Sequence, residues 1–185
     1  MTFTLAKTAG FCFGVNRAVN LVYDLLDKGE RVATLGPIIH NPQLVAELEA
    51  RGVRIIASPK EAESDETVVI RSHGVEQSIY DEMESRSISY ADATCPFVAK
   101  IHRIVAKAAA EGKTVLIAGD PDHPEVVGIR GHAGENVFVV RNADELQKCL
   151  GTLKNSQNPP CILVAQTTYH TTFWRDCFEV ARKHY

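Results

Sequence analysis

Long apolar runs and cleavable leader features are both missing from this sequence. No stretch approaches the roughly 20 apolar residues of a membrane-spanning helix, and Met1 to Lys7 has neither a basic segment nor a small-residue cleavage site. We therefore expect a cytoplasmic protein with no membrane partner. The net charge of −3 over 185 residues is also small, so nothing in the charge balance points to nucleic acid as a partner.

Closely spaced cysteine pairs are absent as well. The chain has 5 cysteines, an odd number at irregular spacings, which is a poor disulfide framework and suits a reducing compartment. The lack of a Cys-x-x-Cys pair also argues against a zinc site. Any cysteine with a special role is therefore expected to be a thiolate ligand or a nucleophile.

Short β-branched runs alternate with helical patterns along the chain. The runs predicted as strands are residues 31–35, 53–56, 67–70, 114–118, 136–140 and 161–165. The clearest predicted helices are Val15 to Asp27, Phe97 to Ala110 and Thr171 to Tyr185; glycine lies shortly after the first two. Such alternation is typical of an α/β fold with mostly parallel strands.

Two segments share the pattern Gly-x-x-x-His after a predicted strand: one begins at Gly36 and the other at Gly119. This weak repeat indicates two similar α/β/α units, which we expect to span residues 14–95 and 96–185. Residues 1–13 would form an N-terminal strand, Phe3 to Lys7, followed by a loop.

Cys12 and Cys95 each lie directly before a predicted helix, and Pro96 occupies a plausible first helical position. Backbone N–H groups and the helix dipole at that place favour the thiolate, which binds iron or attacks electrophiles. A single cysteine there is more often a small packing residue, but two in the same setting favour function. We interpret the other cysteines as packing residues: Cys149, Cys161 and Cys177.

His40, His73 and His123 directly follow predicted strands, whereas His132 follows Gly131. Ligands bind at the carboxyl ends of strands in parallel α/β sheets. One such histidine is commonly a capping or solvated residue, but three at equivalent positions predict a pocket that donates hydrogen bonds to a diphosphate.

Glu125 lies two residues after His123 and is a candidate proton donor, because a carboxyl in a dry pocket beside an anion holds its proton more readily. The alternative is an exposed glutamate in a first helical turn. Thr167 follows the last predicted strand and could hydrogen-bond a substrate hydroxyl or cap the final helix. Sequence pattern alone leaves both choices open.

Taken together, six ordered motifs resemble the LytB/IspH family, the hydroxymethylbutenyl diphosphate reductases. The motifs are Ala9-Gly10-Phe11-Cys12-Phe13-Gly14-Val15, Gly36-Pro37-Ile38-Ile39-His40-Asn41, Arg71-Ser72-His73-Gly74, Asp92-Ala93-Thr94-Cys95-Pro96, His123-Pro124-Glu125-Val126 and Gln166-Thr167-Thr168. The resemblance implies an oxygen-sensitive [4Fe-4S] cluster at the centre of three α/β units with pseudo-threefold symmetry. The third unit, which would pair with the first strand, is not in this chain.

The resemblance also implies residue roles. Cys12 and Cys95 would be two of three cluster ligands, the third cysteine lying beyond Tyr185. The three histidines would bind the substrate diphosphate, Glu125 would deliver the proton that removes the hydroxyl as water, and Thr167 would orient that hydroxyl. The reaction implied is reductive dehydroxylation of 4-hydroxy-3-methylbut-2-enyl diphosphate to isopentenyl and dimethylallyl diphosphates in the non-mevalonate pathway, with ferredoxin or flavodoxin as electron donor. The 185-residue chain alone would be inactive.

Two other classes of function compete with this interpretation. A non-catalytic phosphate-ester-binding α/β module would use the same histidines while Cys12 and Cys95 are structural, and iron content separates it from the reductase. A cysteine-dependent hydrolase or transferase using Cys12 is disfavoured because no Cys-His-Asn/Asp set stands at recognisable motifs.

Overall fold

The computed structural model of the chain describes residues 3–4, 6, 9–155 and 159–184. The predicted N-terminal strand lies partly outside them, at Leu5 and Lys7, while Phe3, Thr4 and Ala6 belong to no helix or strand. In the described part, every helix is too short or too polar to cross a bilayer.

The described residues form two compact units. One comprises the chain up to Ser72 together with Ser87–Cys95, and the other comprises His73–Arg86 together with the chain from Pro96 onward. The structural division thus has one boundary between Cys95 and Pro96. Segment 73–86, which the prediction assigned to the first unit, packs with the second.

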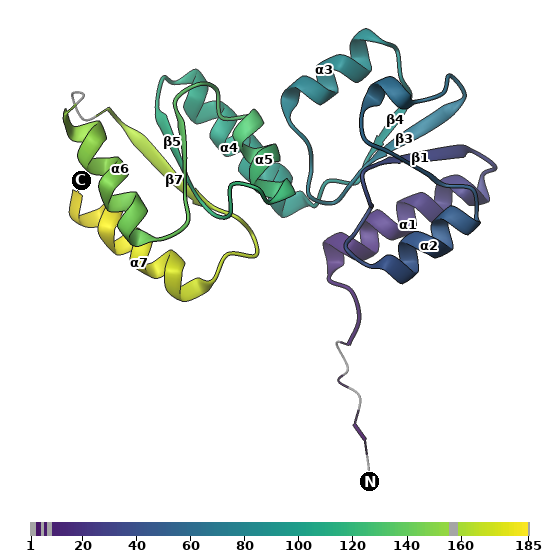
Figure 1. The fold of residues 1–185 in the computed structure, drawn as a ribbon, viewed down its shortest axis with the longest axis horizontal. Helices are drawn as coiled ribbons and strands as arrows, with labels where there is room; N and C mark the ends of the chain where they lie inside the picture. Colours follow the sequence, from purple (N-terminus) through teal and green to yellow (C-terminus); the bar gives the residue numbers. More distant parts are fainter. Residues whose placement is uncertain (1–2, 5, 7–8, 156–158, 185) are drawn as a thin grey trace. The chain divides into compact units, whose positions relative to one another are not determined.

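The first unit contains a four-stranded parallel sheet of order β2-β1-β3-β4, seen in the right half of Figure 1. Its elements, in chain order, are α1 (Phe13–Asp27), β1 (Arg31–Leu35), α2 (Pro42–Ala50), β2 (Arg54–Ile56), the short 3-10 helix η1 (Pro59–Glu61), β3 (Glu66–Ile70) and β4 (Tyr90–Asp92). Helices α1 and α2 pack in one hydrophobic cluster with side chains of β1 and β3, so they cover the same face of the sheet.

Helix α1 forms because its apolar residues recur at helical spacing. Ala18, Val19, Val22 and Leu25 are buried against the sheet. The helix ends at Asp27 with Lys28 as its C-cap, after which Gly29 adopts a φ of 79° that glycine accommodates without strain.

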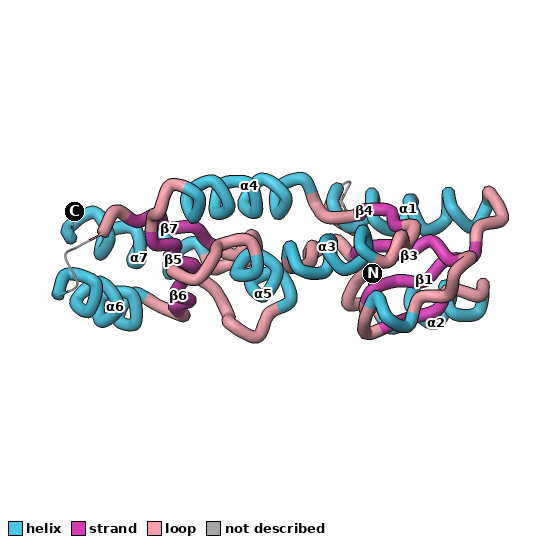
Figure 2. Tube along the Cα trace, turned by 90° about the horizontal axis from the view of Figure 1, so that it is seen from above, coloured by secondary structure: helices cyan, strands magenta, loops and turns pink. Residues whose placement is uncertain are grey.

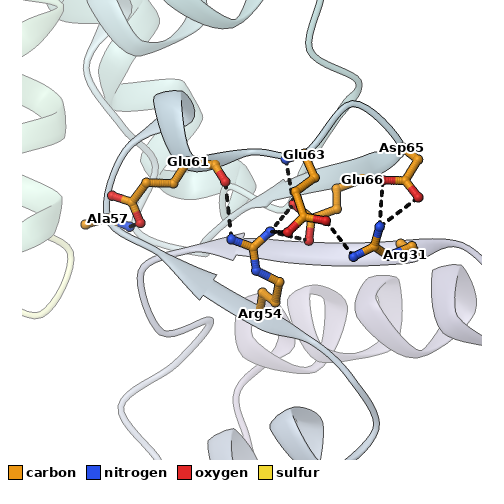
Figure 3. A network of polar contacts seen from close by, with 7 residues as sticks. All are labelled: Arg31, Arg54, Ala57, Glu61, Glu63, Asp65 and Glu66. Atoms are coloured by element: carbon orange, nitrogen blue, oxygen red, sulfur yellow. Dashed lines mark hydrogen bonds and ion pairs between the residues drawn. The ribbon is translucent and has the colours of Figure 1, made fainter.

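The amino ends of the strands in the first unit carry a network of ion pairs (Figure 3). The Glu66 carboxylate, with only 1% of its side chain exposed, lies 2.9 Å from Nη1 of Arg54 and also accepts a hydrogen bond from the backbone N–H of Glu63. Arg31 pairs with Glu63 and Asp65 at 2.7 Å in a solvent-exposed part of the same network. This charged network thus lies at the amino ends of the strands, opposite their carboxyl ends.

The second unit contains a three-stranded parallel sheet of order β6-β5-β7. Its elements are α3 (Gln77–Ser85), α4 (Pro96–Ala110), β5 (Thr114–Ala118), α5 (Pro124–Gly131), β6 (Val137–Val140), α6 (Ala143–Asn155), β7 (Cys161–Ala165) and α7 (Thr171–His184). Figure 2 shows the same elements from above, with the strands in magenta.

Strand β5 is buried over its whole length, as expected for a parallel strand covered on both faces. Val115 and Ile117 pack with α4 and α5, whereas Leu116 and Ala118 pack with α6 and α7. The second unit is therefore a three-layer α/β/α sandwich. Cys149, Cys161 and Cys177 all pack in the α6–α7 layer, and Cys177 is fully buried.

The α/β fold class with parallel sheets is confirmed. The six strands predicted between residues 31 and 165 all form within a residue of their expected bounds, but β4 has no counterpart among them. Its segment Tyr90-Ala91-Asp92 is short and lacks β-branched residues, so it pairs with β3 without carrying a strand-like pattern.

Candidate active site

Cys12 occupies the N-cap position of α1. Its φ and ψ of −65° and 164° are extended, its carbonyl accepts the first helical hydrogen bond from Asn16, and its thiol caps no backbone N–H. The side chain is exposed. Its thiol is therefore available to a ligand at the positive end of a 15-residue helix.

Cys95 lies against the first turn of this helix. A Cβ added at Gly14 would come within 2.7 Å of the Cys95 Sγ atom and 3.1 Å of its Cβ, so only glycine leaves room for the thiol. The backbone N–H of Cys95 donates to the carbonyl of Ser72 at 2.9 Å, which fixes the residue at the carboxyl end of β3. Cys12 thus caps α1 and Cys95 lies against the first turn of that helix, and two thiols are a donor set that suits a group held by thiolates.

Arg17 connects α1 to the segment that leads to Cys95. Its guanidinium donates to the carbonyl of Thr94 at 3.0 Å and to that of Asp92 at 3.2 Å. The Asp92 carboxylate in turn accepts a hydrogen bond from the N–H of Thr94. Sequence analysis did not identify Arg17, because its partners are backbone atoms 75 and 77 residues away, and such contacts leave no pattern among the side chains.

His40 lies in an exposed turn after β1, directly before Asn41. The Asn41 side chain caps α2 by accepting hydrogen bonds from the N–H groups of Gln43 and Leu44. His40 itself is not the cap, so the capping alternative does not apply to it. It is left at the carboxyl edge of the first sheet with its side chain exposed.

Arg71, which follows β3, is a second residue that sequence analysis did not single out. Its Nη1 atom lies within 2.8 Å of the place that a Cβ of Gly36 would take, so the guanidinium rests on the turn after β1. Burial lowers the pKa of this guanidinium, and no carboxylate among the described residues pairs with it. A cation in this state is suited to an anionic ligand. The Arg-Ser-His-Gly motif was the sequence feature that could have pointed to Arg71.

His123 is the N-cap of α5. Its Nδ1 atom accepts a hydrogen bond of 3.2 Å from the N–H of Glu125, which leaves Nε2 as the donor of a neutral ring. The His73 ring lies edge-on to it, with 5.5 Å between centroids. The capping alternative is thus realised at His123, but through only one ring nitrogen. The second unit brings two of the predicted histidines together.

Glu125 is buried, with an exposed fraction of 2%, so the alternative of an exposed helical glutamate is wrong. Its carboxylate accepts hydrogen bonds from the backbone N–H of Thr167 at 2.6 Å and from its hydroxyl at 2.7 Å. Thr167 does not cap α7, which begins four residues later at Thr171. The predicted proton donor and hydroxyl-orienting residue are therefore in direct contact at the carboxyl edge of the second sheet.

Gln166, directly before Thr167, is hydrogen-bonded on both sides. It is buried, its Oε1 atom accepts a hydrogen bond from the N–H of Asp120, and its Nε2 atom donates to the Thr168 hydroxyl at 2.7 Å. Asp120 follows β5 and Gln166 follows β7, so the first of these bonds joins neighbouring strand ends. Across the described ranges, no three His, Cys, Asp or Glu side chains cluster in a way that could hold a metal ion.

Comparison with known proteins identifies the family. The family model described as "LytB protein" matches residues 3–185. The chain belongs to the LytB family. The match spans both units and every motif on which the resemblance rested.

Similar curated proteins carry the name 4-hydroxy-3-methylbut-2-enyl diphosphate reductase. The one from Geotalea uraniireducens is 43% identical over 168 residues, covering 91% of this chain and 57% of the relative. The one from Thermoanaerobacter sp. is 37% identical over 187 residues, covering 98% of this chain and 62% of the relative. The chain therefore spans about three fifths of the length of these relatives.

Solved structures of the same family share the fold. The reductase from Plasmodium falciparum superposes with a TM-score of 0.87 at 25% identity, covering 96% of this chain and 55% of that protein. A second reductase, described as the terminal enzyme of the non-mevalonate pathway, has a TM-score of 0.81 at 35% identity and covers 97% and 63%.

Proposed function

We propose that the protein is a reductase that converts 4-hydroxy-3-methylbut-2-enyl diphosphate to isopentenyl and dimethylallyl diphosphates. Membership of the LytB family and the shared name of its relatives support the reaction class. The observation that carries the proposal is the buried Glu125 carboxylate bonded twice by Thr167 beside the cap formed by His123. Because the chain spans only part of its relatives, the activity is proposed for the protein completed to their length.

Cys12 and Cys95 are proposed to hold a [4Fe-4S] cluster as thiolates, with a third cysteine from outside this chain. The contact of Cys95 with Gly14, two residues after Cys12, supports a shared role for the two thiols. A bound cluster would supply the two electrons of the reaction, received singly from a ferredoxin or flavodoxin. Arg17 keeps the Cys95 segment against α1 and is a positioning residue for that thiol.

His40, His73 and His123 are proposed to bind the diphosphate. His123 has its Nε2–H available because Nδ1 already accepts the N–H of Glu125. Arg71, whose half-buried guanidinium has no carboxylate partner in the described residues, adds a positive charge at the carboxyl edge of the first unit. Charge-assisted hydrogen bonds of this kind are the strongest that a protein offers to phosphate oxygens.

Glu125 is proposed to deliver the proton that turns the leaving hydroxyl into water. Two electrons and two protons convert the carbon–oxygen bond into a carbon–hydrogen bond and release one water. When Glu125 is protonated, it can donate to Thr167 Oγ1 across the 2.7 Å contact, and the threonine hydroxyl can then donate to the substrate oxygen. Burial of the carboxyl keeps bulk water away from this path.

The decisive experiment extends the chain by the part of the Geotalea uraniireducens relative that it does not match. After anaerobic reconstitution, we expect about four irons and equivalent sulfide per chain, together with turnover of the substrate. Cys12→Ser and Cys95→Ser should each lose most of the iron, while Cys149→Ser, a cysteine packed in the α6–α7 layer, serves as the matched control. Full iron content in Cys12→Ser or Cys95→Ser would refute the ligand assignment. An extended chain that binds pyrophosphate but never iron would favour a phosphate-ester-binding module.

A further inference from the structure

Helix α5 packs on segment 73–76 with almost no side chain between them. A Cβ added at Gly131 would lie 2.4 Å from the Cβ and 2.8 Å from the Cα of Glu76. One turn earlier, a Cβ at Gly128 would lie 3.6 Å from the carbonyl oxygen of His73, an ordinary contact. The glycines thus bring the helix backbone against the segment that carries His73. Helix α5 also contacts α3 and α4 (Figure 2).

His132, the C-cap residue of α5, hydrogen-bonds the same segment. Its Nε2 atom lies 2.9 Å from the carbonyl oxygen of Val75. A carbonyl only accepts, so Nε2 carries the proton in this contact. The Val75 side chain is itself buried, and its carbonyl would be costly to leave without a partner.

The His132 ring is held in place by its neighbours. His102 of α4, with an exposed fraction of 6%, stacks on it with ring centroids 4.2 Å apart and an interplanar angle of 27°. Tyr80 of α3 contacts the same ring at a tilt, with 6.2 Å between centroids. The ring therefore has little rotational freedom, and its bond to Val75 has a fixed direction.

Both ends of α5 thus contact one four-residue segment. At the N-terminal end the His123 ring meets His73, and at the C-terminal end His132 holds Val75. The helix has 8 residues and a length of about 12 Å, so it acts as a rigid bar between the two contacts.

We propose that His132, held by the stacked ring of His102, is a positioning residue that keeps His73 beside His123 for binding of the diphosphate. The inference rests on the proposed role of the two histidines in that binding. His132 touches no proposed ligand group; it acts through the Val75 carbonyl. Loss of its hydrogen bond should release segment 73–76 and separate the two rings, leaving each histidine chemically intact.

The test uses nuclear magnetic resonance on the 185-residue chain, comparing His132→Met with His132→Gln. Methionine removes the donor at similar size, whereas the glutamine amide can still donate to Val75. A nuclear Overhauser effect between the ring protons of His73 and His123 should be present in the unchanged chain, absent in His132→Met and restored in His132→Gln. In the protein extended to the length of its relatives, affinity for inorganic pyrophosphate should fall about tenfold in His132→Met and recover in His132→Gln.

The two readouts separate the inference from the proposed function. If the ring contact is lost in His132→Met while pyrophosphate fails to bind even the otherwise unchanged extended protein, the diphosphate role is wrong and the positioning stands. If the ring contact and the affinity both persist in His132→Met, the positioning is overturned.

Glycine variants of α5 provide a second test should His132→Met not fold. Gly131→Ala must push Glu76 away and should weaken the ring contact, whereas Gly128→Ala meets only ordinary contacts and should preserve it. Equal ring contacts in the two variants would overturn the proposal.

Discussion

Replacement of Gly14 by alanine should destabilise the first unit, although alanine is the better helix former. Without other contacts, the change would stabilise a helix by about 0.5–1 kcal/mol. The new methyl group, however, would come within 2.7 Å of Cys95 Sγ and 3.1 Å of its Cβ. Rotation about the Cα–Cβ bond of Cys95 can move the sulfur but not the Cβ. Overpacking of this kind costs about 1–3 kcal/mol, so we expect a net loss of about 1 kcal/mol.

Hydrogen exchange is the suitable assay because it reports each unit separately. The amides of β1 should exchange about fivefold faster in Gly14→Ala, the factor that 1 kcal/mol gives at room temperature. Fluorescence of the only tryptophan, Trp174 in α7, reports the second unit, whose unfolding transition should be unchanged. The matched control is Gly151→Ala in α6, where nothing lies within 4 Å of the added methyl and stability should rise.

A stabilising effect of Gly14→Ala would contradict the expected crowding by Cys95. If Gly14→Ala stabilises the first unit as Gly151→Ala stabilises the second, then Cys95 is not confined against α1. The two thiols would then have no structural reason to act together at the N-terminal turn of α1. If instead the variant is less stable and the extended protein also retains less iron, the same contact serves both stability and ligand placement.

Three further predictions follow from buried or hydrogen-bonded groups. Arg54→Met should destabilise the first unit by about 3 kcal/mol in urea unfolding, because it leaves the buried Glu66 carboxylate without its cation. The control Arg31→Met removes a solvent-exposed ion pair and should change stability little. Equal losses in the two variants would contradict the role of burial. Glu125→Gln in the extended protein should abolish turnover while iron content and pyrophosphate affinity are retained, and full activity would remove Glu125 from the proton path. Burial raises the pKa of Tyr169 from 10.0 to about 12, so the unfolded chain ionises first and the stability of the second unit should fall as the pH rises between these values. Tyr169→Phe should remove this dependence of stability on pH. An unchanged dependence would assign it to other groups.

The regular elements could be predicted because their patterns are local. Strands β5 and β7 carry continuous β-branched and apolar runs, and α1 carries apolar residues at helical spacing, so sequence alone located all three. The pairing of Glu125 with Thr167 could not be predicted in this way. The two residues are 42 positions apart and meet only because β5 and β7 are neighbours in the sheet.

Backbone-mediated contacts were beyond the reach of sequence analysis. Arg17 binds carbonyl groups, and His132 binds the carbonyl of Val75, so neither has a partner whose side chain reveals the interaction. Choosing between a proton donor and an exposed helical glutamate at Glu125 required knowledge of its burial, which depends on packing between elements and not on the adjacent residues. The cluster and diphosphate roles of the cysteines and histidines stay predictions.

The ion-pair network of the first unit has a consequence for how freely this protein can change. Strands of five residues separate its charges from the carboxyl edge by about 16 Å. That distance is about twice the Debye length at physiological salt, so exposed charges at one edge scarcely alter the potential at the other. Substitutions of Arg31, Glu63 or Asp65 can therefore adapt the unit to heat or salt while Cys12 and Cys95 keep their electrostatic surroundings. Stability and chemistry can evolve independently within a single sheet.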